Sequence, residues 1–121
     1  MKENISGKSL GKHILLDLYN CELESLNNVE TIEKILEKSA KEANTTILQK
    51  SFHKFNPHGI SGFILIAESH LSIHVWPEYR YAAIDIYTCG DKAMPEKAMK
   101  VLIEEFKPKS FSMVKHDRGF I

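Results

Sequence analysis

Apolar and polar residues alternate in the middle of the chain with the period of two that is typical of a β-strand. Between residues 70 and 76, one face carries Leu71, Ile73 and Val75. The opposite face carries His70, Ser72, His74 and Trp76. Polar and ionisable groups on such a face need partners when they are removed from water, because burying them unpaired is costly. The face is therefore a candidate functional surface.

The same pattern divides the rest of the chain into strands and helices. Alternation and β-branched content predict strands at residues 13–21, 45–55, 60–68, 70–76, 81–88 and 110–115. Apolar residues at helical spacing predict one helix from the caps Asn27 and Asn28 to Ala43, and a second from Pro95 to Lys107. The order β-α-β-β-β-β-α-β predicts an α/β (α+β) two-layer sandwich, one mainly antiparallel sheet with both helices on one face.

The apolar positions also predict how the strands at 70–76 and 81–88 pair. One buried face should hold Ile73, Val75, Ile84 and Ile86. A pairing in which residue numbers sum to 159 then sets His70 opposite Cys89 and His74 opposite Asp85. This register would gather His74 and Cys89 beside the Glu68–Ser69 bond in one small patch.

Composition indicates one ordinary globular domain, residues 1–121. Apolar residues make up 43% of the chain and charged residues 26%. Sixteen basic and sixteen acidic residues cancel, which argues against nucleic acid and anionic membrane as partners. We find no apolar run of signal-peptide or membrane-spanning length, so we expect a cytoplasmic protein. Cys21 and Cys89 are far apart in sequence, and we expect two free thiols, with Cys21 in the core.

The candidate patch has several interpretations. Satisfied packing residues are the commonest fate of such side chains. A metal site could draw on His70, His74 and Cys89, with His53 or His58 as a further ligand. However, residues four apart on a strand are separated by roughly 13 Å, too far to share one ion.

A nucleophilic site is the remaining interpretation. Ser69 or Cys89 could attack with His74 as the base and Asp85 as its orienting carboxylate. The chain has no GxSxG elbow between a strand and a helix, and a serine within a strand-like run is badly placed to attack a substrate. Ser69 is better placed to attack its own backbone, at the carbonyl of Glu68, if that peptide is strained.

The run GISGFILIAESHLSIHVWPEYRYAAIDIYTCG carries a more specific signal. It resembles the core of the prokaryotic S-adenosylmethionine decarboxylases, the small pyruvoyl-dependent enzymes of polyamine synthesis. The segments GKHILLDLYNC, SFHKFNPHG and HDRG also resemble this family, so the similarity covers nearly the whole chain. Within the long motif only variable positions such as Arg80 differ.

The resemblance implies that the chain is a proenzyme that cuts itself between Glu68 and Ser69, giving chains 1–68 and 69–121. The hydroxyl of Ser69 attacks the carbonyl carbon of Glu68 to give an ester. Ser61 matches the serine that supports this step, and Gly62 beside it would let the backbone approach closely. His74 matches the base that removes the α-proton of Ser69. The ester then breaks by β-elimination, and loss of ammonia leaves a pyruvoyl group on residue 69, with no metal required.

The resemblance also implies the substrate chemistry. The pyruvoyl group forms a Schiff base with S-adenosylmethionine and takes up electrons as carbon dioxide leaves, and Cys89 matches the proton donor to the product. The product is the aminopropyl donor for spermidine synthesis. Phe55 and Trp76 match the family's aromatic pair around the adenine, and Glu78 matches a polar contact to the nucleoside. We expect His70 to border the substrate as well, with a partly structural role. Family members of this size form homodimers whose sites use both protomers.

Two alternatives remain open. Some relatives with the same fold and self-processing decarboxylate arginine or ornithine, although the retained aromatic pair, Phe55 and Trp76, favours a nucleoside ligand. A protein of another class, an unprocessed metal- or ligand-binding module, would keep its chain intact.

Overall fold

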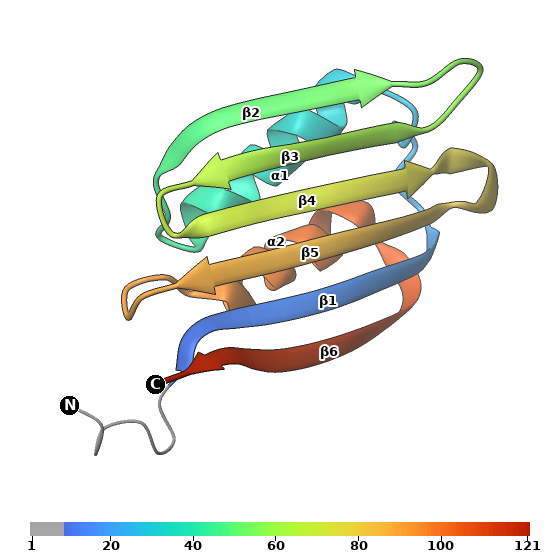
Figure 1. The fold of residues 1–121 in the computed structure, drawn as a ribbon. Helices are drawn as coiled ribbons and strands as arrows, with labels where there is room; N and C mark the ends of the chain where they lie inside the picture. Colours follow the sequence, from blue (N-terminus) through green and yellow to red (C-terminus); the bar gives the residue numbers. More distant parts are fainter. Residues whose placement is uncertain (1–8) are drawn as a thin grey trace.

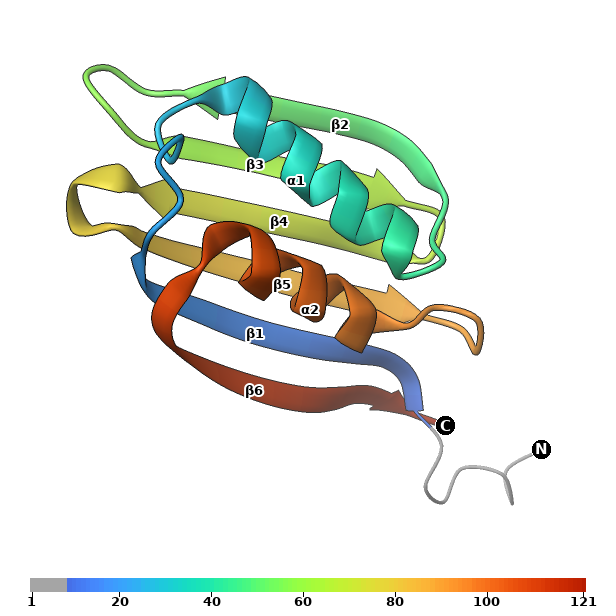
Figure 2. The same cartoon turned by 180° about the vertical axis from the view of Figure 1, so that it is seen from behind.

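A computed structural model describes residues 9–121 as one antiparallel sheet with two helices packed on one of its faces (Figures 1 and 2). The elements in chain order are β1 (Ser9–Cys21), α1 (Val29–Glu42), β2 (Ile47–Lys54), β3 (Ile60–Ile66), β4 (Ser69–Trp76), the 3-10 helix η2 (Pro77–Tyr79), β5 (Tyr81–Cys89), α2 (Pro95–Phe106) and β6 (Pro108–Phe120). The two-layer architecture and the element order predicted from the sequence are confirmed. Residues 1–8, part of the single-domain prediction and of the search for a targeting segment, lie outside the described residues.

The strands are ordered β2-β3-β4-β5-β1-β6, so the first strand lies near the end of the sheet between β5 and β6. The predicted register of β4 on β5 is wrong by two residues: His70 lies opposite Tyr87, and His74 lies opposite Ala83. Alternation fixes which face a residue occupies, and a shift of two residues leaves that face unchanged. The length of the turn decides the register, because Trp76 pairs directly with Tyr81 and leaves a four-residue connection between β4 and β5.

The core lies between the sheet and the two helices. Helix α1 begins as predicted at Asn28, whose side-chain oxygen accepts a hydrogen bond of 2.9 Å from the backbone N–H of Thr31, and α2 begins at Pro95. The largest fully buried side chains come from both layers and include Ile14, Leu16, Leu18, Ile32, Leu36, Ile64, Leu71, Ile73 and Phe106. The aliphatic face that the sequence assigned to the hairpin is therefore the face beneath the helices.

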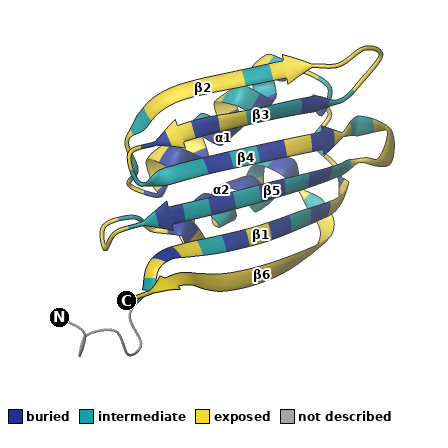
Figure 3. Cartoon of the chain, in the orientation of Figure 1, coloured by how far each residue is buried: buried dark blue, intermediate teal, exposed yellow. Residues whose placement is uncertain are grey.

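Strand β6 departs most from the sequence prediction, which gave residues 110–115. It spans Pro108–Phe120 and is exposed along nearly its whole length (Figure 3). It pairs with β1 at one edge of the sheet, and neither helix covers it (Figure 2). A strand in this position is stabilised by its ladder of backbone hydrogen bonds more than by burial, so its hydrophobic pattern is weak.

The second face of the sheet carries no helix (Figure 1). We call it the open face; across the sheet it includes Ser61, Phe63, His70, Ser72, His74, Trp76, Asp85, Tyr87, His13, Leu15 and Arg118. Large apolar side chains on it stay exposed, with Phe63 at 43% and Leu15 at 42%. Neither helix within residues 9–121 is long and apolar enough to cross a membrane.

Two phenylalanines on the helix side of the sheet provide a test of this core. Phe106 is fully buried, whereas Phe111 on β6 is 49% exposed. We expect Phe106→Ala to lower the free energy of unfolding by about 3–5 kcal/mol through lost burial and a cavity. Phe111→Ala should change it by about 1 kcal/mol or less. Urea unfolding followed by far-UV circular dichroism at one fixed protein concentration measures both, and equal losses would contradict this placement of the core.

Candidate active site

The Glu68–Ser69 bond lies in the tight turn that joins β3 to β4. Ser69 has a backbone φ of 139°, in a region that only glycine adopts without strain. Such a conformation costs of order 1–3 kcal/mol and persists where the surrounding structure fixes it. Here the ladder holds Ser69 on both sides, opposite Ile66 on β3 and Thr88 on β5. Backbone strain is therefore present at this serine, directly beside the peptide that the sequence interpretation expected to be strained.

Backbone hydrogen bonds fix both halves of Glu68. Its carbonyl oxygen accepts a hydrogen bond of 2.7 Å from the backbone N–H of Cys89. Its side-chain Oε1 accepts one of 3.1 Å from the backbone N–H of Thr46. On the other side of the bond, the hydroxyl of Ser69 lies 3.5 Å from Nδ1 of His70. Glu68, Ser69, His70 and Cys89 thus form one cluster, which we call the cleavage cluster.

A second group of predicted site residues surrounds a pocket of about 260 Å³ at the other end of β3 and β4. The lining includes Phe55, His58, Ser61, His74, Trp76 and Glu78. The hydroxyl of Ser61 lies 2.8 Å from Nδ1 of His74, directly across the β3–β4 ladder. We call this group the aromatic pocket. Its open shape and two aromatic rings suit a flat, partly polar ligand.

The ring of Trp76 is held in place by a stack of tyrosines. Tyr81 lies against it with ring centroids 5.3 Å apart, and Tyr19 lies 5.5 Å beyond Tyr81. The hydroxyl of Tyr81 donates a hydrogen bond of 2.5 Å to Asp17. The neighbouring carboxylate raises the pKa of Tyr81 to about 12, because the bond favours the protonated phenol.

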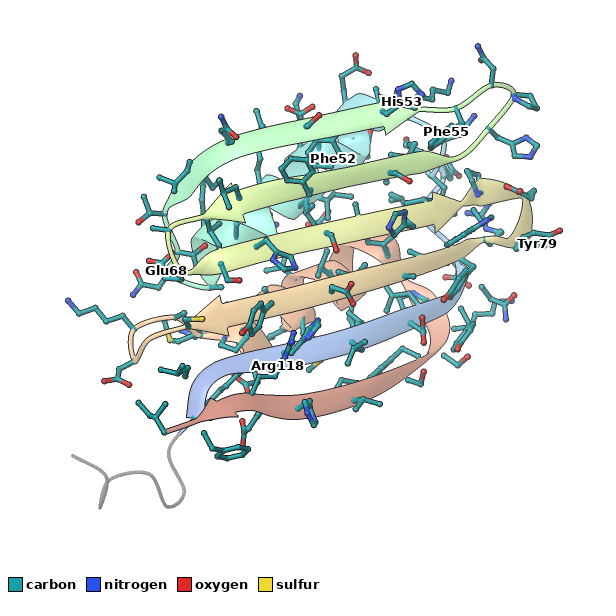
Figure 4. All side chains as sticks on the ribbon, in the orientation of Figure 1. Phe52, His53, Phe55, Glu68, Tyr79 and Arg118 are labelled. Atoms are coloured by element: carbon teal, nitrogen blue, oxygen red, sulfur yellow. The ribbon has the colours of Figure 1, made fainter. Side chains whose placement is uncertain are left out.

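The cleavage cluster and the aromatic pocket lie at opposite ends of the sheet. His74 is five residues from Ser69 along β4, which corresponds to about 17 Å of extended chain. Figure 4 shows the same separation, with Glu68 at one end of the sheet and His53, Phe55 and Tyr79 toward the other. The prediction that His74 shares a patch with the Glu68–Ser69 bond is therefore wrong within one chain. The prediction assumed that these residues share a face and that they lie close together along the strand. Alternation supports the first assumption but says nothing about the second.

Between the two lies a polar group that the sequence interpretation missed. His13 lies 3.7 Å from Asp85 and has its ring centroid 5.2 Å from that of Tyr87, while Arg118 lies over the Tyr87 ring at 5.0 Å. His70 meets the same tyrosine edge-on at 5.6 Å. Burial lowers the pKa of His13, and Asp85 partly opposes this effect. The segments HDRG and GKH were signals in the sequence, but their meeting depends on β1 lying between β5 and β6.

The geometry weakens two alternatives from the sequence. Asp85 accepts a hydrogen bond of 3.4 Å from Ser72 and approaches His13, so it is not the orienting carboxylate of His74. Within residues 9–121, no three His, Cys, Asp or Glu side chains gather as a metal-binding group.

Two smaller expectations also have clear outcomes. A Cβ on Gly62 would come within 2.1 Å of the ring of Phe52, so this glycine makes room for an aromatic side chain and not for close backbone approach at Ser61. Cys21 is buried in the core as expected, and burial raises the pKa of its thiol to about 11. Cys89 is half-buried beside the carbonyl of Glu68.

Comparisons with known proteins identify the family of this chain. The family model described as S-adenosylmethionine decarboxylase matches residues 12–119. The chain is 50% identical to the S-adenosylmethionine decarboxylase proenzyme of Thermodesulfovibrio yellowstonii, over 93% of this chain and 84% of that one. It is 49% identical to the proenzyme of Thermosipho melanesiensis, over 93% and 86%. The crystal structure of the adenosylmethionine decarboxylase from Aquifex aeolicus superposes with a TM-score of 0.89 at 42% identity, over 95% of each chain.

Matches of this extent define an enzyme of the carboxy-lyase class. The chain belongs to the S-adenosylmethionine decarboxylase family.

The tyrosine stack behind Trp76 makes a testable prediction. We expect Asp17→Asn to lower the pKa of Tyr81 from about 12 toward the ordinary value of about 10, because the charged acceptor is lost. The raised pKa of Tyr81 stabilises the folded state below about pH 10, and this contribution is lost as pH rises toward 12. Titration of the phenolate absorbance measures the pKa, with Tyr81→Phe identifying the signal. An unchanged titration curve in Asp17→Asn would contradict the assignment.

Proposed function

We propose that this enzyme decarboxylates S-adenosylmethionine, giving the aminopropyl donor for spermidine synthesis, after cutting itself between Glu68 and Ser69. The observation that carries the proposal is the strained backbone of Ser69, placed next to a carbonyl that already accepts a strong hydrogen bond. The positive φ of Ser69 stores strain directly beside the bond to be cut, and this strain can be released when that bond breaks. Family membership supports the same reaction.

The first step of cleavage is attack by the hydroxyl oxygen of Ser69 on the carbonyl carbon of Glu68. Negative charge develops on the carbonyl oxygen, and the backbone N–H of Cys89, 2.7 Å away, is a donor aimed at that charge. The C–N bond then breaks, so Glu68 is held as an ester on the oxygen of Ser69. The side-chain bond from Glu68 to the Thr46 N–H keeps the acyl part in place during this shift.

The second step needs a base at the α-carbon of Ser69. His74 is the family match, and its Nδ1 is occupied by Ser61, which orients the ring and leaves Nε2 for proton transfer. Removal of the α-proton expels the carboxylate of Glu68 by β-elimination. The dehydroalanine left on residue 69 exchanges its nitrogen for the oxygen of water and releases ammonia, leaving a pyruvoyl end. That end supplies an electron sink when carbon dioxide leaves the substrate.

About 17 Å of strand lies between His74 and Ser69, so we propose that the two meet across a homodimer. Two copies can pack with their open faces together about a two-fold axis that runs between the two sheets, parallel to them and perpendicular to the strands. This packing brings the cleavage cluster of one protomer to the aromatic pocket of its partner. The open face carries exposed apolar side chains such as Phe63 and Leu15, and these favour a second protomer packing against it.

In this arrangement each site takes Ser69 and Cys89 from one protomer, and the base His74 together with the binding groups from the other. Phe55 and Trp76 stack on the adenine and attract the sulfonium. Glu78 accepts hydrogen bonds from the ribose. Cys89 donates the proton that replaces the lost carboxylate, and His70, packed on Tyr87, borders the same end.

Intact mass of the denatured protein tests the cleavage. We expect two chains, residues 1–68 and residues 69–121, with the second lighter by one ammonia than a chain that starts with serine. Ser69→Ala should stay at full length, because the nucleophile is absent. Ser72→Ala, a serine elsewhere on the same strand, should be cut normally. A full-length mass for the unaltered protein, or cleavage in Ser69→Ala, would contradict the proposal.

A mixed dimer tests the shared site. Cys89→Ala removes a group of the cleavage cluster, and Trp76→Ala removes a wall of the aromatic pocket, so each homodimer should lose most of its decarboxylase activity. In a mixed dimer purified through two different tags, one site combines the intact Cys89 of one protomer with the intact Trp76 of the other. We expect about half of the wild-type specific activity, since one site of two is intact.

If the site were built within one chain, both sites of the mixed dimer would carry a defect. Its activity would then not exceed the mean of the two homodimers, and the shared site would be ruled out. Homodimers carrying the same two tags are the controls.

A further inference from the structure

Two turns border the aromatic pocket, and a contact between their side chains joins them. One turn, residues 55–59, follows β2 and carries Phe55 and His58. The other, residues 77–80, follows β4 and carries Glu78. Nε2 of His58 lies 3.3 Å from Oε2 of Glu78, and both side chains line the pocket. The contact therefore lies in the wall of the site.

Hydrogen bonds to the end of β1 and to the segment between β1 and α1 already fix the backbones of both turns. The guanidinium of Arg80 donates to the carbonyl oxygens of Cys21 and Leu23. Arg80 also accepts a hydrogen bond of 2.9 Å at its own carbonyl from the backbone N–H of Cys21. These bonds anchor the turn that carries Glu78 without any help from His58.

The first turn is anchored in a similar way. The side-chain oxygen of Asn27 accepts a hydrogen bond of 3.1 Å from the backbone N–H of Gly59. The backbone N–H of Phe55 donates to the carbonyl of Gly59 at 2.8 Å, closing the turn on itself. Because neither backbone depends on His58, what its contact can fix is the side chain of Glu78.

Glu78 needs such support if it binds the ligand. Its side chain is about one-third exposed, and a glutamate that reaches into a pocket has three rotatable bonds to order. His58 holds Oε2, and Oε1 has no bonded partner within residues 9–121. A carboxylate held by one oxygen presents the other in a defined direction, which suits the paired hydroxyls of a ribose.

We propose that His58 is a positioning residue for Glu78, and that it sets affinity for the hydroxyl-bearing part of a nucleoside ligand. This inference rests on the proposed function, because it takes the pocket as the nucleoside site. The substrate classes left open by the sequence differ at this point: arginine and ornithine carry no vicinal hydroxyls. His58 therefore contributes to the choice of S-adenosylmethionine over a plain amino acid.

Binding of 5′-methylthioadenosine tests the proposal without the chemical step, because this nucleoside has no α-amine to react. His58→Ala should weaken its binding to the processed enzyme about threefold to fivefold, the upper part of the range for an exposed ion pair. In a Glu78→Gln background the same change should have little effect, since the carboxylate that His58 positions is gone. His58→Gln keeps an N–H donor near the position of Nε2 and should restore most of the binding. Tyr79→Ala, at a 71% exposed residue on the same turn, is the control and should bind normally.

Steady-state kinetics gives a second readout. His58→Ala should raise KM for S-adenosylmethionine by a similar factor and leave kcat and the extent of self-cleavage unchanged, because His58 contacts Glu78 and not the groups that carry out cleavage and decarboxylation. Unchanged binding in His58→Ala, or an equal loss in the Glu78→Gln background, would overturn the role of His58 and leave the proposed function intact. A cleaved wild-type enzyme that does not bind 5′-methylthioadenosine would overturn both.

Discussion

The rise of an extended strand is the constraint on which the rest of this structure depends. β4 is paired with β3 on one edge and β5 on the other, so it cannot fold back on itself. Ser69 begins it and Trp76 ends it, a separation of about 23 Å. A reaction that uses both ends of such a strand cannot be completed in one chain without breaking the ladder. The position of each half of the site follows from this fixed length.

The sheet that separates the two halves also maintains the strain at the cleavage site. Ser69 is paired on both sides, and the carbonyl and carboxylate of Glu68 each accept a backbone N–H. Relaxing the φ of Ser69 would require breaking several of these bonds together, which costs more than the 1–3 kcal/mol of strain. The conformation thus persists for as long as these hydrogen bonds are intact. The backbone N–H of Cys89 has two effects. It fixes the carbonyl of Glu68 in the uncut chain, and it would stabilise negative charge on that oxygen during attack by Ser69.

The face of each residue could be predicted from the sequence, but the partners across the sheet could not. Alternation placed Leu71, Ile73 and Val75 beneath the helices and the histidines opposite, and both assignments hold. Pairing was wrong by two residues because a shift of two preserves every face, and only the short turn at Pro77–Tyr79 selects the register.

Contacts between residues far apart in the sequence could not be predicted from its periodicity. His13 and Arg118 come from opposite ends of the chain and meet at Tyr87 because β1 inserts between β5 and β6, and no local pattern encodes that order. The family motif identified Ser69, His74 and Cys89 as chemical residues, yet it carried no distances. Their separation into two groups appears only when the strands are placed. His58 was weighed in the sequence only as a metal ligand, because its contact with Glu78 joins two turns about twenty residues apart.

Covering the open face and completing the site are two needs that the proposed homodimer would meet together. A sheet with helices on one side leaves aromatic and aliphatic groups in water on the other, and here those groups surround the chemical ones. A lid from within the chain could exclude water, but it would not shorten the distance from His74 to Ser69. A second copy turned by a two-fold axis does both, because it exchanges the ends of the sheet as it covers the face. The polar centre around His13 and Asp85 lies between the two sites, where charged groups can pair across the axis and favour one register of packing over others.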